Sequence, residues 1–281
     1  MNAELLDILQ VLSLEPRGAL TPLSGGDIAA VYELDTSQGA VVIKHDDPAR
    51  LRGETEGLRA LKGAGSSLVI PEVLGQHGEW LVIESLHTVP RSNQADIQLG
   101  EGLRELHAVI GSEHGWWHDN ACGRTPQPNA SVDDGRVFQR ERRLLALGRA
   151  CLERRLIDPL LYARLESQAW ALETWLPNIS PGLVHGDLWA GNVLYTASGP
   201  ALIDPAVYRH YPEVDLAMLT LFGDPGEHFF DAYWNGDTPT DWSRREALFQ
   251  LYPLLNHVLL FGGMYLGGVE RCLAKLERSG A

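Results

Sequence analysis

The sequence predicts an α+β fold of two lobes, a small antiparallel sheet followed by a larger, mainly helical part. Three observations lead to this prediction. Residues 20–44 have the pattern of short strands separated by glycine-containing turns. After residue 95 the apolar residues recur mostly at helical spacing. The 281 residues are 44% hydrophobic and 21% charged, which is enough apolar material for two separate cores.

The first lobe is expected to span residues 1–86. A helix over residues 4–14 should end at Pro16 and Gly18. Three strands then share residues 20–44, with a Gly-Gly turn and a Ser-Gln-Gly turn between them. Apolar residues at helical spacing predict a further helix over residues 50–62, and residues 71–86 supply two more strands. The product is a five-stranded antiparallel sheet with one long helix.

The second lobe is expected to span residues 87–281. Helices are predicted over four ranges: 95–109, 137–156, 159–176 and a long C-terminal region, 241–276. Two interruptions separate these helices. They are a loop rich in Trp, Pro, Gly and Asn over residues 111–135, and a region of short strands over residues 183–205.

The composition argues against several classes of protein. The formal net charge is −14 and no basic cluster extends beyond short Arg pairs, so no nucleic-acid partner is expected. No apolar run approaches the roughly 20 residues that cross a bilayer, and the first ten residues do not resemble a secretory signal. We therefore expect a cytoplasmic protein without a membrane partner. The three cysteines are widely spaced, which favours reduced thiols over disulfides or a zinc site.

The strongest local pattern is LVHGDLWAGNVLY followed by ALIDP, which contains His185, Asp187, Asn192 and Asp204. Phosphoryl transfer requires metal ions on the phosphates and a group that receives the proton of the attacking hydroxyl. We interpret Asp187 as the proton acceptor, and Asn192 and Asp204 as Mg²⁺ ligands. Such residues also close turns and cap helices. All four in this order, between apolar strands, favour catalysis.

A second candidate group is the ammonium of Lys44, at the end of the apolar strand AVVIK. The chain has only three lysines, and the other two, Lys62 and Lys275, lie on the polar parts of predicted helices. A lysine held by a carboxylate at this place can reach the α- and β-phosphates of ATP. Glu54 is the expected partner, and Glu56 on the same short helix is the alternative.

Two further segments are candidate nucleotide contacts. A glycine-containing turn before Lys44 can offer backbone donors to phosphate oxygens. Its candidate residues are Ser24, Gly25, Gly26 and Asp27. The junction after the second apolar strand is the expected hinge between the lobes, where backbone groups can pair with adenine. Its candidate residues are Glu84, Ser85 and Leu86.

The Asp followed five residues later by Asn, and then by Asp204, resembles the catalytic and metal-binding residues of protein kinases. Protein kinases have Arg before the catalytic Asp and Phe-Gly after the metal Asp. Here the corresponding residues are Gly186 and Pro205-Ala206, which indicates the small-molecule kinase branch of the protein-kinase-like superfamily.

Longer strings resemble one family within this branch. They are GWWHDNACGRTPQPN (115–129), ALIDPAVYRHYPEVDLAMLTLFG (201–223) and LYPLLNHVLLFGGMYLGGV (251–269). With them the chain resembles the fructosamine kinases, or ketosamine kinases, along nearly its whole length. The TPQPN and IDPAVY strings distinguish it most clearly from general aminoglycoside and choline kinases.

The resemblance implies an ATP- and Mg²⁺-dependent kinase with a nucleotide-binding first lobe. Its acceptor would be the 3-hydroxyl of a ketosamine, either a small molecule or protein-bound, in a monomer or homodimer. The 3-phosphate product releases the amine, so the reaction leads to deglycation. Trp189, His185 and Trp116 are expected near the substrate, although Trp189 could be packing beneath the loop and the Trp116-Trp117 pair could pin the long loop. Asp215 is expected to anchor the catalytic loop through backbone hydrogen bonds.

Two other functions compete with this one. The first is a kinase of the same fold that acts on an aminoglycoside, a choline-like compound or a plain sugar. The second is a catalytically inactive, nucleotide-binding regulator. A degenerate kinase usually loses at least one residue of the Lys, Asp, Asn, Asp set, whereas this chain has all four.

Overall fold

The computed structural model describes residues 3–23 and 29–279. Its first part is a five-stranded antiparallel sheet in the order β1-β2-β3-β5-β4. The strands are β1 (Thr21–Pro22), β2 (Ala30–Thr36), β3 (Gly39–His45), β4 (Val73–His77) and β5 (Trp80–Glu84). This is the small antiparallel lobe that the sequence predicted.

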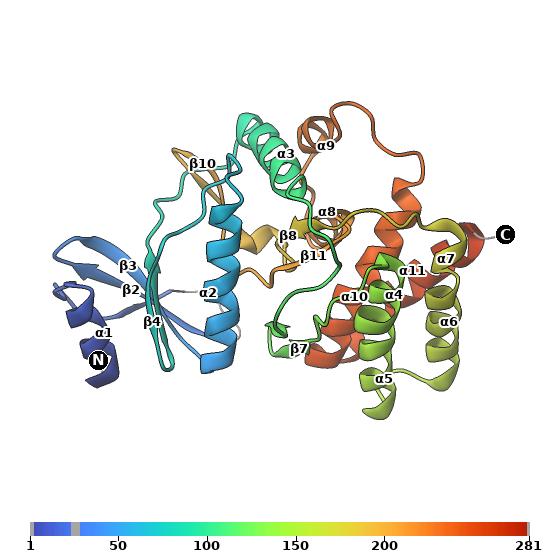
Figure 1. Cartoon of the computed structure of the whole chain (residues 1–281), viewed down its shortest axis with the longest axis horizontal. Coiled ribbons are helices and arrows are strands. Elements are labelled where there is room, and N and C mark those ends of the chain that lie inside the picture. The colour runs from blue at the N-terminus through green and yellow to red at the C-terminus, as the bar shows by residue number, and fades with distance from the viewer. Residues whose placement is uncertain (1–2, 24–28, 280–281) are drawn as a thin grey trace.

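Helices cover both faces of this sheet, α1 (Ala3–Val11) on one side and α2 (Pro48–Gly63) on the other (Figure 1). The strand β5 shows why both faces need cover, because its side chains alternate between two cores. Trp80 and Val82 belong to the core that includes α1, whereas Leu81 and Ile83 belong to the core that includes α2. The continuous apolar run of β5 therefore reflects a strand that is buried on both faces.

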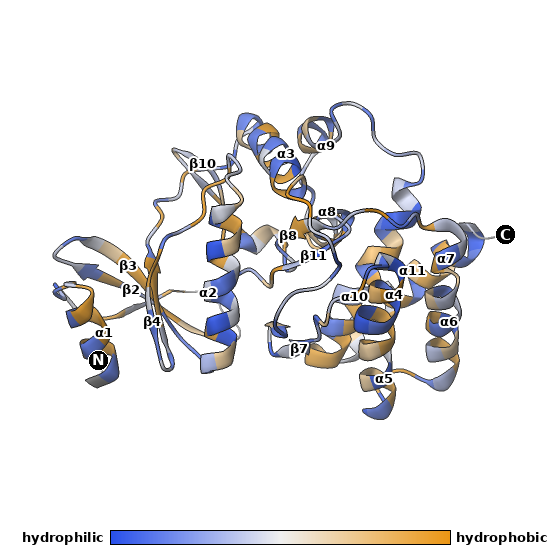
Figure 2. Cartoon of the chain, in the orientation of Figure 1, coloured by the Kyte–Doolittle hydropathy of each residue, from blue (hydrophilic) through white to orange (hydrophobic). Residues whose placement is uncertain are grey.

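The second part is mainly helical, and one large apolar core unites it with α2. Its helices are α3 (Asn93–His107), α4 (Gly135–Phe138), α5 (Leu145–Glu153), α6 (Pro159–Trp170), α7 (Leu172–Trp175), α8 (Glu213–Leu221), α9 (Glu227–Trp234), α10 (Trp242–Phe261) and α11 (Leu266–Ser279). Apolar stretches alternate with polar ones along these helices, as amphipathic packing requires (Figure 2). The helical lobe is thus also as predicted, which makes the fold α+β.

Three two-stranded sheets lie among these helices. They pair β6 (Asn120–Cys122) with β7 (Thr125–Gln127), β8 (Gly182–Val184) with β11 (Tyr208–His210), and β9 (Val193–Thr196) with β10 (Gly199–Leu202). The loop predicted over residues 111–135 therefore contains a short hairpin. The 3₁₀ turn η2 (Ala190–Asn192) leads from the predicted catalytic loop into β9.

Three predicted helices are interrupted in the structure. The range 159–176 divides into α6 and α7 at Ala171. The range 137–156 holds α4, a π-helix η1 (Gln139–Leu144) and α5. The C-terminal region breaks at Gly262, whose φ of +87° is favourable for glycine, and resumes through the 3₁₀ turn η3 (Gly263–Tyr265) into α11. Helical periodicity alone did not reveal these interruptions, because the apolar pattern continues through them.

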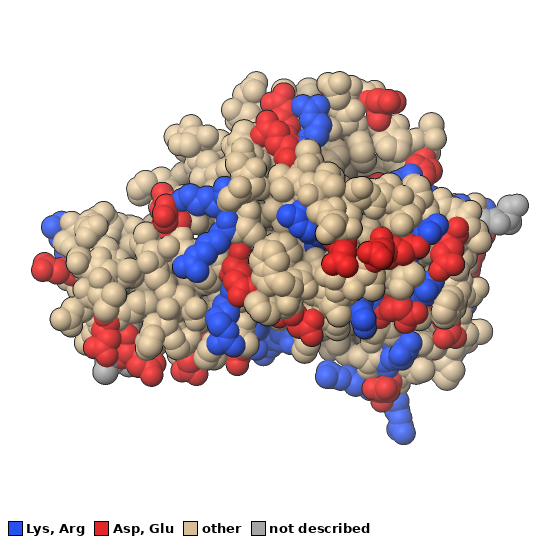
Figure 3. Space-filling view, viewed as in Figure 1, with Lys and Arg blue, Asp and Glu red and all other residues tan. Residues whose placement is uncertain are grey.

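Charged side chains of both signs are interspersed on the face shown in Figure 3, without a continuous basic surface. The cysteines Cys122, Cys151 and Cys272 are all buried and free. Within residues 3–23 and 29–279, no helix combines the length and apolarity needed to cross a membrane. The structure places β5 and α3 on either side of the predicted lobe boundary at residue 86, which stays a prediction.

Candidate active site

The ammonium of Lys44 lies between two carboxylates at the junction of the two lobes. Lys44 is on β3, 4% exposed, and its Nζ donates to Glu54 Oε1 at 2.5 Å. The same Nζ also contacts the carboxylate of Asp204. Burial by itself would lower the pKa of Lys44, but the two carboxylates outweigh it and raise that pKa above its usual range. Lys44 is therefore charged at neutral pH.

The alternative partner of Lys44 lies elsewhere on α2. Glu56 Oε2 is 3.3 Å from His118 Nδ1, at an exposed site. Glu54 is instead turned toward the sheet, and burial raises the pKa of its carboxyl while Lys44 opposes that shift. Of the two glutamates, the structure brings Glu54 to Lys44.

A backbone hydrogen bond brings Asn192 close to Asp204. The N–H of Ile203, the residue before Asp204, donates to the Asn192 carbonyl at 3.1 Å. The Asn192 side chain donates from Nδ2 to the backbone carbonyl of Asp187 at 2.8 Å. Its Oδ1 is not used in this bond and can serve as a metal ligand. Amide and carboxylate oxygens are the ligands that bind Mg²⁺ in kinase sites. The residues present therefore fit a magnesium ion.

Asp215 anchors the loop that carries Asp187. Its Oδ2 accepts from the His185 N–H at 2.7 Å, and its Oδ1 accepts from the Gly186 N–H at 2.9 Å. His107 Nε2 lies 3.1 Å from the same carboxylate. The expected role of Asp215 as an anchor of the catalytic loop is confirmed.

Gly186 occupies the place of the protein-kinase Arg for a steric reason. Its φ is +82°, and a Cβ at this position would lie 2.1 Å from the carbonyl oxygen of Ala206. The same two segments are joined where the Ala206 N–H donates to the His185 carbonyl at 2.9 Å. Only glycine permits this close approach, which sets Asp187 next to the segment that follows Asp204.

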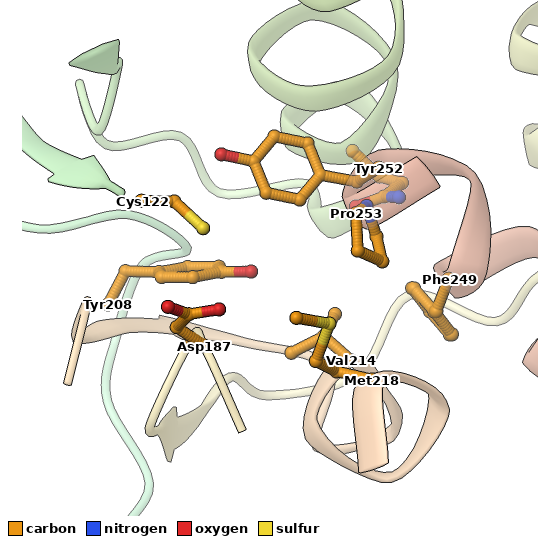
Figure 4. Close-up of a pocket in the computed structure, with 10 residues that line it drawn as sticks. Cys122, Asp187, Tyr208, Val214, Met218, Phe249, Tyr252 and Pro253 are labelled. Atoms are coloured by element: carbon orange, nitrogen blue, oxygen red, sulfur yellow. The ribbon is translucent and has the colours of Figure 1, made fainter. Parts of the chain in front are cut away.

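Asp187 lies in the wall of a pocket that is partly open to solvent (Figure 4). The pocket is lined by Cys122, Gln139, Gly186, Asp187, Tyr208, Val214, Met218, Phe249, Tyr252 and Pro253. Burial in this largely apolar pocket raises the pKa of Asp187 to about 7, and Asp204 adds to the shift. A carboxylate with this pKa can accept a proton near neutral pH.

His185 does not face this pocket, contrary to the expected substrate contact. Its side chain is fully buried, with Nε2 donating to the Ile203 carbonyl at 2.9 Å and Nδ1 accepting from the Asp187 N–H at 3.3 Å. Both ring nitrogens are thus used inside the protein. His185 links the Asp187 loop to the segment before Asp204.

Trp116 is also placed differently from the expectation of a substrate contact. It is 6% exposed and part of the main core, and its ring packs against Trp117 with 3.9 Å between the centroids. Trp117 is the exposed member of this pair. The pair therefore packs the long loop through Trp116 and leaves only Trp117 at the surface.

Trp189 is 38% exposed and is not among the residues that line the Asp187 pocket. Its indole folds over Gly191, so that a Cβ on Gly191 would lie 2.2 Å from Trp189 Cη2. The Trp189 side chain therefore packs partly against its own loop and is partly exposed to solvent.

Of the two predicted nucleotide-binding segments, only the hinge lies within the described residues. Ser24, Gly25, Gly26 and Asp27 lie outside the described residues. At the hinge, Glu84 ends β5 and Ser85 Oγ donates to Glu33 Oε1 at 3.0 Å. The structure places Leu86 just beyond, partly buried, in the extended segment between the lobes.

Several pocket residues were not expected from the sequence. They are Cys122, Gln139, Tyr208, Val214, Met218, Phe249, Tyr252 and Pro253. They come from the hairpin, the π-helix, β11, α8 and α10, so no local spacing joins them. The only signal was that most of them lie within the longer strings that carried the family resemblance.

Comparison with known proteins supports this resemblance. The family model for fructosamine kinase matches residues 12–279. A probable ketoamine kinase of Lactiplantibacillus plantarum is 33% identical over 265 residues, covering 90% of this chain and 92% of that protein. The structure of a putative fructosamine-3-kinase from Thermobifida fusca has a TM-score of 0.91 and 28% identity, and the match covers 99% of both chains.

The fold is shared more widely. Aminoglycoside phosphotransferase APH(4)-Ia, in a ternary complex with AMP-PNP and hygromycin B, has a TM-score of 0.67 at 20% identity, over 100% of this chain and 99% of that one. This similarity places the fold among the protein-kinase-like phosphotransferases. The match of the family model over nearly all of the sequence is more specific, and the chain belongs to the fructosamine kinase family.

Proposed function

We propose that this protein transfers the γ-phosphoryl group of ATP to the 3-hydroxyl of a ketosamine. The observation that carries the proposal is the contact of Lys44 from the sheet lobe with Asp204, beside the loop of Asp187. Phosphoryl transfer depends mainly on positioning and on charge stabilisation, and these three residues supply both. Release of the amine from the 3-phosphate would make the overall reaction a deglycation.

Asp187 is the proposed proton acceptor. The oxygen of the acceptor hydroxyl attacks the γ-phosphorus, the bond from phosphorus to the β,γ-bridging oxygen breaks, and ADP leaves. The hydroxyl proton passes to the carboxylate of Asp187, whose pKa of about 7 suits this task.

The remaining roles concern the nucleotide. Lys44, held by Glu54, would bind the α- and β-phosphates, and Asn192 and Asp204 would hold Mg²⁺. When bound, Mg²⁺ would neutralise charge on the phosphate oxygens. The proposed phosphate loop is Ser24 to Asp27, and the proposed adenine contacts are the backbone groups of Glu84 to Leu86.

The pocket favours a ketosamine over an aminoglycoside. Asp187 is the only carboxylate among the described residues that line it, and the other side chains are mainly apolar or aromatic. An acceptor with many cationic groups would need more than one carboxylate to replace its hydration. The partly exposed Trp189 could pack against the apolar face of a sugar ring. A cytoplasmic enzyme that acts on small-molecule or protein-bound ketosamines fits these features.

The test is turnover of a ribulosamine with ATP and Mg²⁺, followed by ³¹P NMR of the product. A new phosphomonoester signal coupled to the proton on carbon 3, followed by release of the amine, is the expected result. Fructosamine, kanamycin, choline and the free sugar form the comparison panel. Phosphorylation of kanamycin or choline without turnover of either ketosamine would refute the proposed acceptor.

A further inference from the structure

One polar side chain of the Asp187 pocket lacks a full set of partners. Gln139 begins the π-helix η1, is 1% exposed and lines the pocket together with Asp187. Its Nε2 has no hydrogen-bond partner in the described part of the chain, whereas its Oε1 lies 3.0 Å from His210 Nε2. An unpaired buried polar group destabilises the folded state, so a ligand that supplies the missing partner is favoured. π-helical turns occur frequently at functional sites.

The partners of His210 determine how the Gln139 amide must be oriented. His114 Nε2 lies 3.0 Å from the Ile179 carbonyl, and His114 Nδ1 lies 2.9 Å from His210 Nδ1. A carbonyl only accepts, so His114 carries its proton on Nε2, and its Nδ1 must accept from His210 Nδ1. Burial lowers the pKa of both rings, which are therefore neutral near pH 7. His210 Nε2 is then an acceptor.

A donor must therefore face His210, and Gln139 can supply it only from its amide nitrogen. The oxygen and nitrogen of a glutamine amide are nearly the same size and exchange places when the amide is turned by 180°. In the turned orientation Nε2 donates to His210 Nε2, and the carbonyl oxygen becomes the atom that has no hydrogen-bond partner among the described residues. Gln139 then offers the pocket a hydrogen-bond acceptor in addition to Asp187.

We propose that Gln139 determines acceptor specificity, with its side-chain carbonyl oxygen accepting a hydrogen bond from the amine N–H of the acceptor molecule. His210 and His114 are positioning residues that hold the amide in this orientation. The identity of the acceptor rests on the proposed function: a ketosamine places a protonated amine near the hydroxyl that reacts. Asp187 accepts from that hydroxyl, and a charged N–H donor makes the stronger kind of hydrogen bond with a carbonyl.

The orientation is tested without any substrate by ¹⁵N NMR of histidine-labelled protein at pH 7. His210 should carry its proton on Nδ1 only, and its Nε2 should show the shift of an unprotonated nitrogen that accepts a hydrogen bond. Gln139→Leu should move that Nε2 resonance, because its donor is removed. A proton on His210 Nε2 in the wild type would overturn the inference.

Specificity is tested with a ribulosamine and its analogue that has an ether oxygen in place of the amine nitrogen. Gln139→Leu should lower kcat/KM for the ribulosamine by about 10- to 100-fold relative to the analogue, as expected for one lost bond to a charged donor. If Gln139→Leu does not fold, Gln139→Met serves the same comparison. An equal effect on both compounds, or none on either, would count against the proposed contact.

The matched control is Gln250→Leu. Gln250 is on α10 but does not line this pocket, and its Nε2 donates to Ala217 and Thr220. Gln250→Leu should leave the ratio of kcat/KM for the ribulosamine to that for the ether analogue unchanged. Failure of the wild type to phosphorylate either compound would refute the proposed acceptor, and the orientation of Gln139 would still be judged by the NMR result.

Discussion

Lys44 contacts Asp204 across 160 residues of sequence, and this ion pair joins the sheet lobe to the segment that follows the Asp187 loop. In the proposed function, this pair brings one cation and one metal-type carboxylate to a single triphosphate. It also identifies the residues whose loss should affect nucleotide use more than folding.

Lys44→Met should raise the KM for ATP and lower kcat/KM by about 100-fold or more, because the ammonium that we propose to position the phosphates is lost. Steady-state kinetics at varied ATP concentration measures both effects. The matched control is Lys62→Met, since Lys62 pairs with Glu72 at the surface. Similar kinetics for the two variants would argue against a phosphate role for Lys44.

Asp187→Asn should lower kcat by about 100- to 10,000-fold, because the proposed proton acceptor is lost while the shape of the side chain is kept. ATP affinity, measured by calorimetry, should change little. Asp237→Asn, at an exposed position, is the control and should retain activity. Normal turnover by Asp187→Asn would exclude this residue as the base.

The activity should depend on the ionisation of Asp187. Because its carboxylate is the active form and its pKa is about 7, log kcat/KM should fall with unit slope as the pH decreases below about 7. A profile that stays flat down to pH 5 would contradict this assignment.

The same pKa predicts an effect on stability. A carboxyl whose pKa is raised in the folded state favours folding below its unfolded pKa, near 3.8, and this contribution is lost as the pH rises through about 7. Asp187→Asn removes the buried charge, so its Tm should exceed that of the wild type at pH 8 by more than at pH 5. Thermal unfolding at the two pH values measures the difference. An identical shift at both would indicate that Asp187 titrates as in the unfolded chain.

Gly186→Ala should disrupt the catalytic loop, because a Cβ would meet the Ala206 carbonyl and the residue has a positive φ. We expect a loss of about 1–3 kcal/mol in unfolding free energy, together with loss of turnover. Urea unfolding and kinetics measure the two effects. Gly63→Ala is the control, since a Cβ there meets no atom within 4 Å. Full activity in Gly186→Ala would contradict the close packing at this glycine.

Sequence periodicity was sufficient for the elements whose pattern is local. The run WLVIE predicted a buried strand, and β5 has that form because both of its faces are covered. Periodicity failed at η1, where the apolar pattern continues although the hydrogen bonding changes to that of a π-helix. The choice between Glu54 and Glu56 also needed the structure, since two residues on one short helix differ only in the side that they face.

The sequence alone determined the two-lobed fold and the candidate residues Lys44, Asp187, Asn192 and Asp204, because strand periodicity and the spacing of a single loop are local properties. Only the tertiary structure decided which side chains surround Asp187. It turned His185 and Trp116 inward and brought Gln139 to the pocket wall. The physical reason is that burial and hydrogen-bond partners depend on contacts between segments far apart in the chain, which no local pattern encodes.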